Sequence, residues 1–414
     1  MSRPVVLSNS SSGDASPSEL DPFLGRKNPS PRASLVGGVA SASTQSSAPD
    51  SPGRAALRSR RFRTTLLVCL VVGLLFLTLL LLSDNGLQFR PSVRMPVGIP
   101  ESRRYLYNPN TREFKVLLIA DPDKRSATSE KRHQFQSFTK EGVLVRNPEG
   151  RYEIRWGEEK PVLSKMNEGL RGMELSELVF FNGQLLTGDD RTGIIFELKD
   201  NKVYPRHILA DGDGNQSKGF KIEWATVKEE SLYVGSQGKE FVDAATGEVV
   251  SEGNFFVKRI DENGKLVHEN WKKRYNLLRE SAGITYPGYM IHEAVCWNPH
   301  KEKWYFFPRR ASKEAYDEDL DLDRATNLVL SVVEPFDSLA DISVTNIGEV
   351  NPRRGVSSCK FLPNNPNHVL LVKSEEDEKE NFKSYVTVLD VEHGSVLLDD
   401  VDAGDMKFEG VEFI

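Results

Sequence analysis

The stretch LSELVFFNGQLLTGDDR, residues 175–191, contains the pattern that decides the fold of this 414-residue chain. Ser176 opens an apolar run, Asn182-Gly183 has the composition of a tight hairpin turn, and a second apolar run ends in a polar cluster at 189–191. Short apolar runs bounded by turn residues are typical of buried β-strands. We therefore expect a β-hairpin here, with a serine at the start of its first strand.

The same pattern returns four times, each time with a Ser or Glu ahead of an apolar run. The five key positions lie about 58 residues apart on average, which is enough for a four-stranded propeller blade with its loops. They are Ser176, Glu223, Glu293, Ser357 and Glu409. The last segment, FEGVEFI (408–414), ends with the chain, and FKVLLIADPD (114–123) is expected to supply its partner strand and close the ring. The sequence predicts an all-β, five-bladed β-propeller over residues 105–414, with one helix near 269–282.

Five oxygen donors are expected to converge on the propeller axis, because the first strand of each blade lines that axis. Three carboxylates and two serine oxygens suit a hard cation such as Ca²⁺, which takes six to eight oxygen ligands. The key positions hold no His or Cys, which disfavours zinc and copper. The alternative is that each Glu is an ordinary solvated side chain at the start of a strand.

The second strands end in charged residues that we expect on one face of the propeller. Cations and carboxylates around a metal are suited to phosphoryl transfer to water, because cations offset charge on phosphate oxygens and a carboxylate orients the water. A solvated rim is the alternative. The residues are Asp121, Asp123, Asp189, Asp190, Arg191, Lys239, Glu240, Arg309, Arg310, Lys373, Glu375 and Glu376.

The N-terminal part predicts a membrane anchor. Residues 1–63 contain nine Lys/Arg and four Asp/Glu and have the composition of a disordered tail, whereas residues 64–82 carry no charge. Nineteen helical residues span about 28 Å, enough for a bilayer core. The basic flank predicts a cytosolic N-terminus and a type II protein, with a stem at 83–104. A cleaved signal peptide is the alternative, but no small-residue cleavage site follows the run. The net charge of −6 argues against nucleic-acid binding.

The expected propeller contains the motifs RGMELSEL (171–178), KGFKIEW (218–224), PGYMIHE (287–293), PRRAS (308–312), KSEED (373–377) and FEGVEFI (408–414). Together these motifs resemble the calcium-activated nucleotidases, or apyrases, of the five-bladed type. The resemblance implies one central Ca²⁺ bound by the five key positions and hydrolysis of nucleoside di- and triphosphates, with UDP and GDP preferred in the vertebrate branch. On this basis Asp121 and Asp190 are candidates for activating water, and Arg191, Arg309, Arg310 and Lys373 for binding phosphate.

The resemblance and the predicted topology together place the enzyme in the endoplasmic reticulum and Golgi membrane, where it would support glycosylation. Asn215 lies in a lumenal glycosylation sequon. A homodimer, a form secreted after stem cleavage, and a disulfide between Cys296 and Cys359 are left open. The alternative function is a type II glycosyltransferase, suggested by the acidic motif at 211–213; such an enzyme is expected to alternate helices and strands.

Overall fold

The computed structural model describes residue 99 and residues 101–129, 133–243, 246–377, 379 and 381–414. They belong to one unit, Arg90–Ile414. The expected tail (1–63), membrane span (64–82) and most of the stem (83–104) lie outside the described residues. Among the helices that are described, none has the length and apolar character needed to cross a membrane. The end of the expected stem belongs to the 3-10 helix η1 (Glu101–Tyr107), in which Arg103 is buried against the domain.

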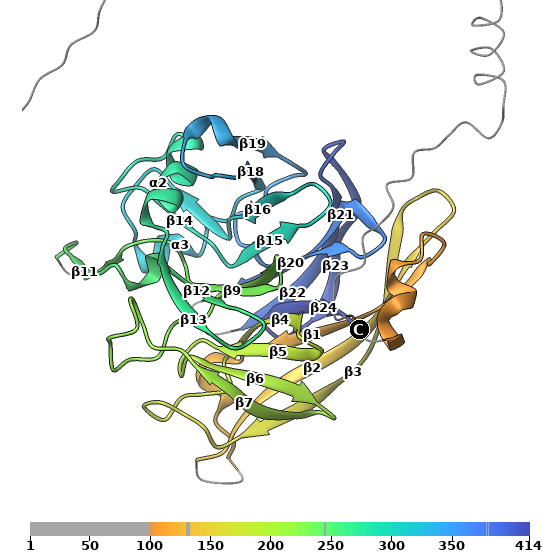
Figure 1. Ribbon diagram of the computed structural model, residues 1–414, viewed down its shortest axis with the longest axis horizontal. Coiled ribbons are helices and arrows are strands. Elements are labelled where there is room, and N and C mark those ends of the chain that lie inside the picture. Colours follow the sequence, from red (N-terminus) through yellow and green to blue (C-terminus); the bar gives the residue numbers. More distant parts are fainter. Residues whose placement is uncertain (1–98, 100, 130–132, 244–245, 378, 380) are drawn as a thin grey trace, which may run out of the picture. The chain divides into compact units, whose positions relative to one another are not determined.

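Five antiparallel, four-stranded sheets form the domain, which confirms the prediction of an all-β, five-bladed propeller (Figure 1). From the innermost strand outward, the sheets are β4 (Leu175–Phe181), β5 (Gln184–Asp189), β6 (Ile194–Lys199), β7 (Lys202–Ile208); β8 (Trp224–Lys228), β9 (Ser231–Gly235), β12 (Phe256–Ile260), β13 (Leu266–Asn270); β15 (Ala294–Asn298), β16 (Lys303–Phe307), β18 (Leu328–Val333), β19 (Ile342–Asn346); β20 (Gly355–Leu362), β21 (Asn365–Glu376), β22 (Phe382–Asp390), β23 (Ser395–Gly404); and β24 (Phe408–Phe413), β1 (Glu113–Ala120), β2 (Phe135–Arg146), β3 (Tyr152–Ser164).

Short elements connect these sheets. Two small strand pairs and several helices are present, and the helix expected near 269–282 is confirmed as α2. The elements are β10 (Phe241–Val242) with β11 (Val249–Ser251), β14 (Tyr289–Ile291) with β17 (Arg310–Ser312), η2 (Asp123–Ser126), η3 (Gly253–Phe255), α2 (Lys272–Ser281), α3 (Glu318–Asp321) and η4 (Leu339–Asp341).

The ring closes through the two ends of the domain. Each innermost strand contacts the next, in the order β4, β8, β15, β20, β24 and back to β4. The C-terminal strand β24 pairs with β1, from Val116 opposite Phe413 to Ala120 opposite Phe408, as the sequence predicted. In Figure 1, dark blue β24 accordingly lies beside orange β1. Because this pairing joins both termini of the domain, the inner sheet edge is not left open.

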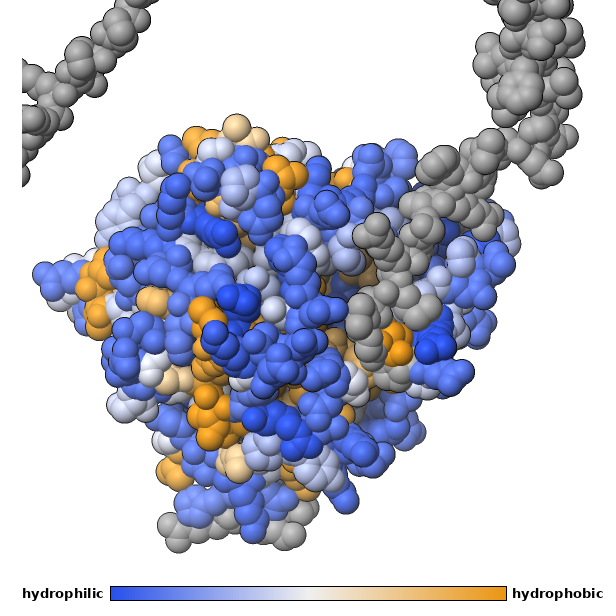
Figure 2. All heavy atoms as spheres, viewed as in Figure 1, coloured by the Kyte–Doolittle hydropathy of each residue, from blue (hydrophilic) through white to orange (hydrophobic). Residues whose placement is uncertain are grey.

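The core consists of five apolar clusters, one between each pair of neighbouring sheets. Leu186 and Val234, for example, pack between the first and second sheets. The face seen in Figure 2 is mostly hydrophilic, with apolar residues in small separate patches. The hairpin between β4 and β5 turns at Asn182 and Gly183, which both have positive φ (49° and 80°). Two successive positive φ values are typical of the hairpin turn that Asn-Gly predicts.

Candidate functional site

All five predicted metal ligands lie at the starts of the innermost strands, and all are buried. Ser176, Ser357 and Glu409 lie within β4, β20 and β24, and Glu223 and Glu293 directly precede β8 and β15. The Ser176 hydroxyl donates to Glu409 Oε2 at 3.0 Å, so these two strands are linked through the predicted ligands. The structure therefore brings together side chains that the repeat in the sequence related to one another.

Irregular strand pairing directs some of these side chains. In β20 and β24 the register shifts at Ser357 and Glu409, and in β4 it shifts at Glu177, next to Ser176. Each shift leaves one extra residue opposite the partner strand, which is a β-bulge. Bulges change the direction of a side chain and are frequent beside active sites.

Two cations hold the central carboxylates in this arrangement. Arg309 Nη1 donates to Glu293 Oε2 and, at 2.9 Å, to Glu409 Oε1. Lys221 Nζ lies 2.8 Å from Glu223 Oε1. Burial raises the pKa of Glu223 to about 8 although Lys221 lowers it, and burial also raises the pKa of Glu293. Three buried carboxylates thus lie close enough to disfavour each other's ionised forms.

Glu409 differs from the other two glutamates. Burial by itself would raise its pKa, but the charges of Lys407 and Arg309 outweigh burial and hold the pKa at about 2. Lys407 Nζ lies 3.2 Å from Glu409 Oε1. The two cations that share the Glu409 carboxylate therefore favour its ionised form.

A second acidic cluster adjoins the first. Asp121, Asp123 and Glu174 each offer an oxygen, and these oxygens lie within 4.8 Å of one another. Lys407 Nζ lies 3.0 Å from Asp121 Oδ2 and 2.9 Å from Asp123 Oδ2, and Arg171 Nε donates to Glu174 at 2.7 Å. Burial raises the pKa of Asp121 well above its usual range, although Lys407 lowers it. Lys407 thus connects this acidic cluster to the central Glu409.

Asp190 is the predicted catalytic residue with a free acceptor. Its Oδ2 accepts from Lys221, whereas among the described residues its buried Oδ1 has no hydrogen-bond partner. Asp121 differs, since its Oδ1 accepts from the Asp123 amide at 2.7 Å and its Oδ2 from Lys407. Asp190 therefore has the acceptor better placed to bind a water molecule.

Of the four residues predicted to bind phosphate, the structure brings two to the central carboxylates. Arg309 bridges the central carboxylates, and Arg310 is fully buried with no partner among the described residues for Nη1 or Nη2. The side chain of Arg191 lies on the more exposed rim, where Nη2 donates to Glu168 at 3.2 Å. Lys373 is directed elsewhere, because its Nζ pairs with Asp400 at 2.7 Å.

The position of Lys373 follows from strand alternation. Successive side chains of β21 point to opposite faces, so Lys373 and Glu375 share one face while Glu376 lies on the other. Glu376 is the residue that reaches the centre, with Oε1 3.7 Å from Arg309 and Oε2 3.9 Å from Lys407.

Other residues of the site were not selected from the sequence. They are Lys221, Lys407, Arg171, Glu174 and Asp321, which lies 4.0 Å from Arg310. The sequence does contain a pattern that indicates the two lysines: Lys221 precedes Glu223 by two residues, and Lys407 precedes Glu409 by two. In an extended chain, residues two apart share a face. The basic residue in each pair could therefore have been assigned to the site with its glutamate.

Two further sequence observations are located by the structure. Asn215 is exposed, and its Nδ2 donates to Asp213 Oδ2 at 3.1 Å.

Cys296 of β15 and Cys359 of β20 form a disulfide that joins neighbouring innermost strands. Cys296 is three residues beyond Glu293, and Cys359 is two beyond Ser357. The disulfide therefore links β20, which contains Ser357, to β15, which begins directly after Glu293.

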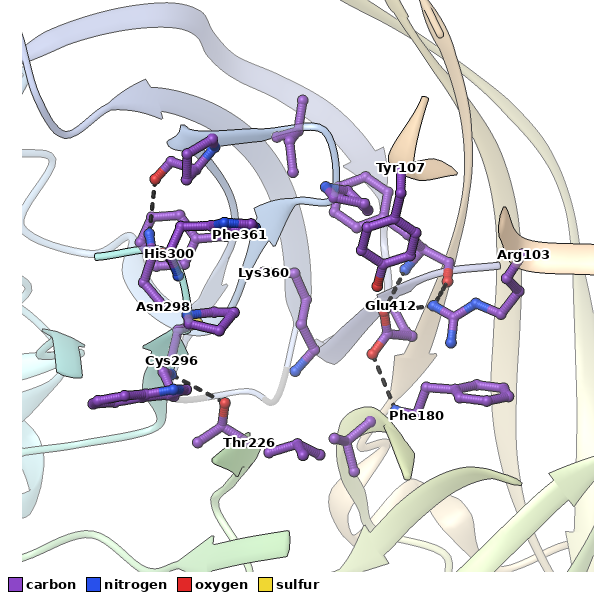
Figure 3. A pocket seen from close by; sticks show the side chains of 18 residues that line it. Arg103, Tyr107, Phe180, Thr226, Cys296, Asn298, His300, Lys360, Phe361 and Glu412 are labelled. Atoms are coloured by element: carbon purple, nitrogen blue, oxygen red, sulfur yellow. Dashed lines mark hydrogen bonds and ion pairs between the residues drawn. The ribbon is translucent and has the colours of Figure 1, made fainter. Parts of the chain in front are cut away.

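A pocket lies at the opposite ends of the innermost strands (Figure 3). All five strands contribute to its lining, through residues that include Phe180, Thr226, Asn298, Phe361 and Glu412. Its charged groups are paired, because Arg103 Nη2 lies 3.1 Å from Glu412 Oε1 and Lys360 Nζ lies 3.0 Å from Glu177 Oε1. Arg103 and Glu177 also keep buried side-chain atoms without partners among the described residues, so such atoms do not distinguish the two ends. We place the candidate functional site at the starts of the strands, because the five predicted ligands lie there together with the cations that pair with them.

Comparison with known proteins shows the family of this chain. The family model described as Apyrase matches residues 122–414. Soluble calcium-activated nucleotidase 1 of Rattus norvegicus is 43% identical over 303 residues, covering 73% of this chain and 74% of the relative. An apyrase of Cimex lectularius is 41% identical over 304 residues, covering 73% and 82%. Apyrase apy-1 of Caenorhabditis elegans is 38% identical over 338 residues, covering 80% and 93%. The chain therefore belongs to the apyrase family.

Proposed function

We propose that this protein is a calcium-dependent nucleotidase that removes the terminal phosphate of nucleoside di- and triphosphates, with UDP and GDP as preferred substrates. The observation that carries the proposal is the position of five buried, oxygen-bearing side chains at the starts of the innermost strands, beside arginine and lysine side chains that pair with them. Relatives named as calcium-activated nucleotidases support the same chemistry.

The central residues suit calcium. Ser176, Glu223, Glu293, Ser357 and Glu409 offer oxygen donors, which are the ligands that Ca²⁺ takes in proteins. The raised pKa values of Glu223 and Glu293 have burial as their main cause. A divalent cation at this point would favour the ionised carboxylates and compensate their burial. When bound, calcium would contribute positive charge that stabilises phosphate oxygens.

The surrounding side chains supply the other functions that hydrolysis needs. The guanidinium groups of Arg309 and Arg310 would bind the phosphate oxygens, since buried arginine donors form strong charge-assisted hydrogen bonds with phosphate. Asp190 Oδ1 would accept a hydrogen bond from water and orient its oxygen toward the terminal phosphorus. Attack forms a new P–O bond and breaks the bond to the bridging oxygen. The products of a diphosphate are a nucleoside monophosphate and inorganic phosphate.

The test is phosphate release by the full-length protein from UDP, GDP and ADP, with calcium, with magnesium and with a calcium chelator. We expect calcium-dependent release that is fastest with UDP and GDP. Glu293→Gln should weaken calcium binding, measured by titration calorimetry, and lower activity at limiting calcium. Glu141→Gln is the control, because Glu141 is an exposed carboxylate of β2 paired with Lys160. Chelator-resistant activity, or unchanged calcium affinity in Glu293→Gln, would contradict the proposal.

The cellular role follows from the products. Glycosyltransferases that use nucleotide sugars release UDP and GDP, and removing these inhibitory products would support glycosylation in the endoplasmic reticulum and Golgi. We propose a type II membrane protein there, anchored by residues 64–82, with Asn215 glycosylated. Protease protection of full-length protein in isolated microsomes tests this topology: the propeller should be protected and an N-terminal tag cleaved.

The glycosyltransferase alternative loses its main support. The motif at 211–213 forms a local turn, in which Asp211 Oδ1 accepts from the Gly212 amide at 2.8 Å and Asp213 Oδ1 from the Asn215 amide at 3.0 Å. Within the described residues, the sheets are antiparallel and do not show the alternation of helices and strands expected of such an enzyme.

A further inference from the structure

Tyr316 lies between β17 and α3 and borders the charged site. The ammonium of Lys239 lies over its ring, 4.0 Å from the ring centroid. The ring of buried Tyr289 meets it edge to face, with centroids 5.2 Å apart. Tyr316 itself is only half-buried. Part of an otherwise well-packed aromatic ring thus remains accessible.

The backbone on both sides of Tyr316 is anchored. Arg324 Nη1 donates to the carbonyl oxygen of Ala315 at 3.1 Å, and Asp317 accepts from the Leu320 amide at 3.0 Å to cap α3. At the end of α3, Asp321 accepts from the Tyr289 hydroxyl. These contacts hold the backbone on both sides of Tyr316, while Lys239 and Tyr289 pack against the ring itself. An aromatic surface that is already held in place loses little conformational freedom on binding.

A chain of contacts links Tyr316 to the proposed phosphate-binding groups: its ring packs on Tyr289, the Tyr289 hydroxyl donates to Asp321, and Asp321 lies 4.0 Å from Arg310. The pKa of the Tyr316 hydroxyl is raised to about 12, mainly by burial and then by carboxylates that include Asp321 and Glu376. Glu376 in turn lies 3.7 Å from Arg309. Lys239 is buried, and the side-chain hydrogen bond described for its ammonium goes to the Glu240 carbonyl oxygen at 3.3 Å. Tyr316 and Lys239 thus form an aromatic and cationic wall near Arg309 and Arg310, on which the nucleoside end of a nucleotide would have a surface to pack.

We propose that Tyr316 is the residue on which the nucleobase of the substrate stacks, an inference that rests on the proposed nucleotidase function. Lys239 covers one face of the ring, and the base occupies the other. Every base has a π face, so stacking contributes affinity without strong discrimination among bases. Tyr316 accordingly makes the site bind nucleotides more tightly than polyphosphates that lack a base, while other contacts select among UDP, GDP and ADP.

The test compares a ligand that has a base with one that has none. We expect Tyr316→Ala to raise KM for UDP about tenfold, the loss typical of one base–aromatic stack. The inhibition constant of inorganic pyrophosphate should stay unchanged, because pyrophosphate contacts the cations alone. Tyr316→Phe keeps the ring and should restore the wild-type KM. Tyr204→Ala, which removes a 40% exposed tyrosine of outer strand β7, is the matched control.

The outcomes separate this inference from the proposed function. Equal weakening of UDP and pyrophosphate by Tyr316→Ala would overturn the stacking role, because a disturbed phosphate site would then explain both. An unchanged KM for UDP would overturn it as well. If wild-type protein released no phosphate from any nucleotide, the proposed function itself would fail.

Discussion

Removing the Lys407 ammonium should destabilise the domain more than removal of an exposed lysine. Lys407 Nζ lies 3.0, 2.9 and 3.2 Å from oxygens of Asp121, Asp123 and Glu409, and its side chain is 10% exposed. In Lys407→Met these carboxylates lose a shared partner. Breaking a buried ion pair by removing one member costs about 3–5 kcal/mol. For a domain of about 310 residues, this corresponds to a fall in Tm of roughly 5–8 °C.

The assay is thermal unfolding in calcium-free buffer, followed by circular dichroism, so that metal binding does not contribute. Lys160→Met is the matched control: Lys160 lies 2.9 Å from Glu141, both side chains are more than half exposed, and such pairs contribute about 0–1 kcal/mol. Adding Asp121→Asn to Lys407→Met should recover part of the loss, because it removes one uncompensated charge. If Lys407→Met lowered Tm no more than the control, the carboxylates would not depend on this lysine as we reason.

Two further predictions concern stability away from the site. Burial lowers the pKa of His368 to about 4, and its Nδ1 lies 2.7 Å from the Tyr152 hydroxyl. The unfolded chain binds a proton at this histidine below about pH 6.5, whereas the folded chain does so only near pH 4. The free energy of unfolding should therefore fall as the pH is lowered from 6.5 to 4, by up to about 1.4 kcal/mol per pH unit. Urea unfolding across this range should show a shallower fall for His368→Gln than for wild type, and equal slopes would contradict the assignment. A Cβ at Gly235 would lie 2.0 Å from the ring of fully buried Trp224, so Gly235→Ala should cost about 1–3 kcal/mol through overpacking. Urea unfolding measures this loss, and wild-type stability in the variant would show that Trp224 moves freely.

The repeat in the sequence was sufficient to predict the propeller and the five central positions. Strand alternation and turn composition are local properties, so the pattern around Ser176 identifies a hairpin without reference to the rest of the chain. The spacing of the key residues then indicates the number of blades. The closing pair was also predictable, because FEGVEFI matches the first strand of a blade and FKVLLIADPD precedes the first complete blade.

Only the tertiary structure decided which charged side chains meet. Lys373 and Glu376 lie in one motif, yet only Glu376 reaches Arg309 and Lys407, because alternation along β21 directs Lys373 to Asp400. The register shift at Glu409 is likewise set by β1, a partner strand distant in the sequence. The sequence by itself thus determined the strands and the positions at which they begin. The ion pair between Asp121 and Lys407 depended on closure of the ring, because it forms only when β24 pairs with β1 from the other end of the domain and brings the two charges within a few ångströms.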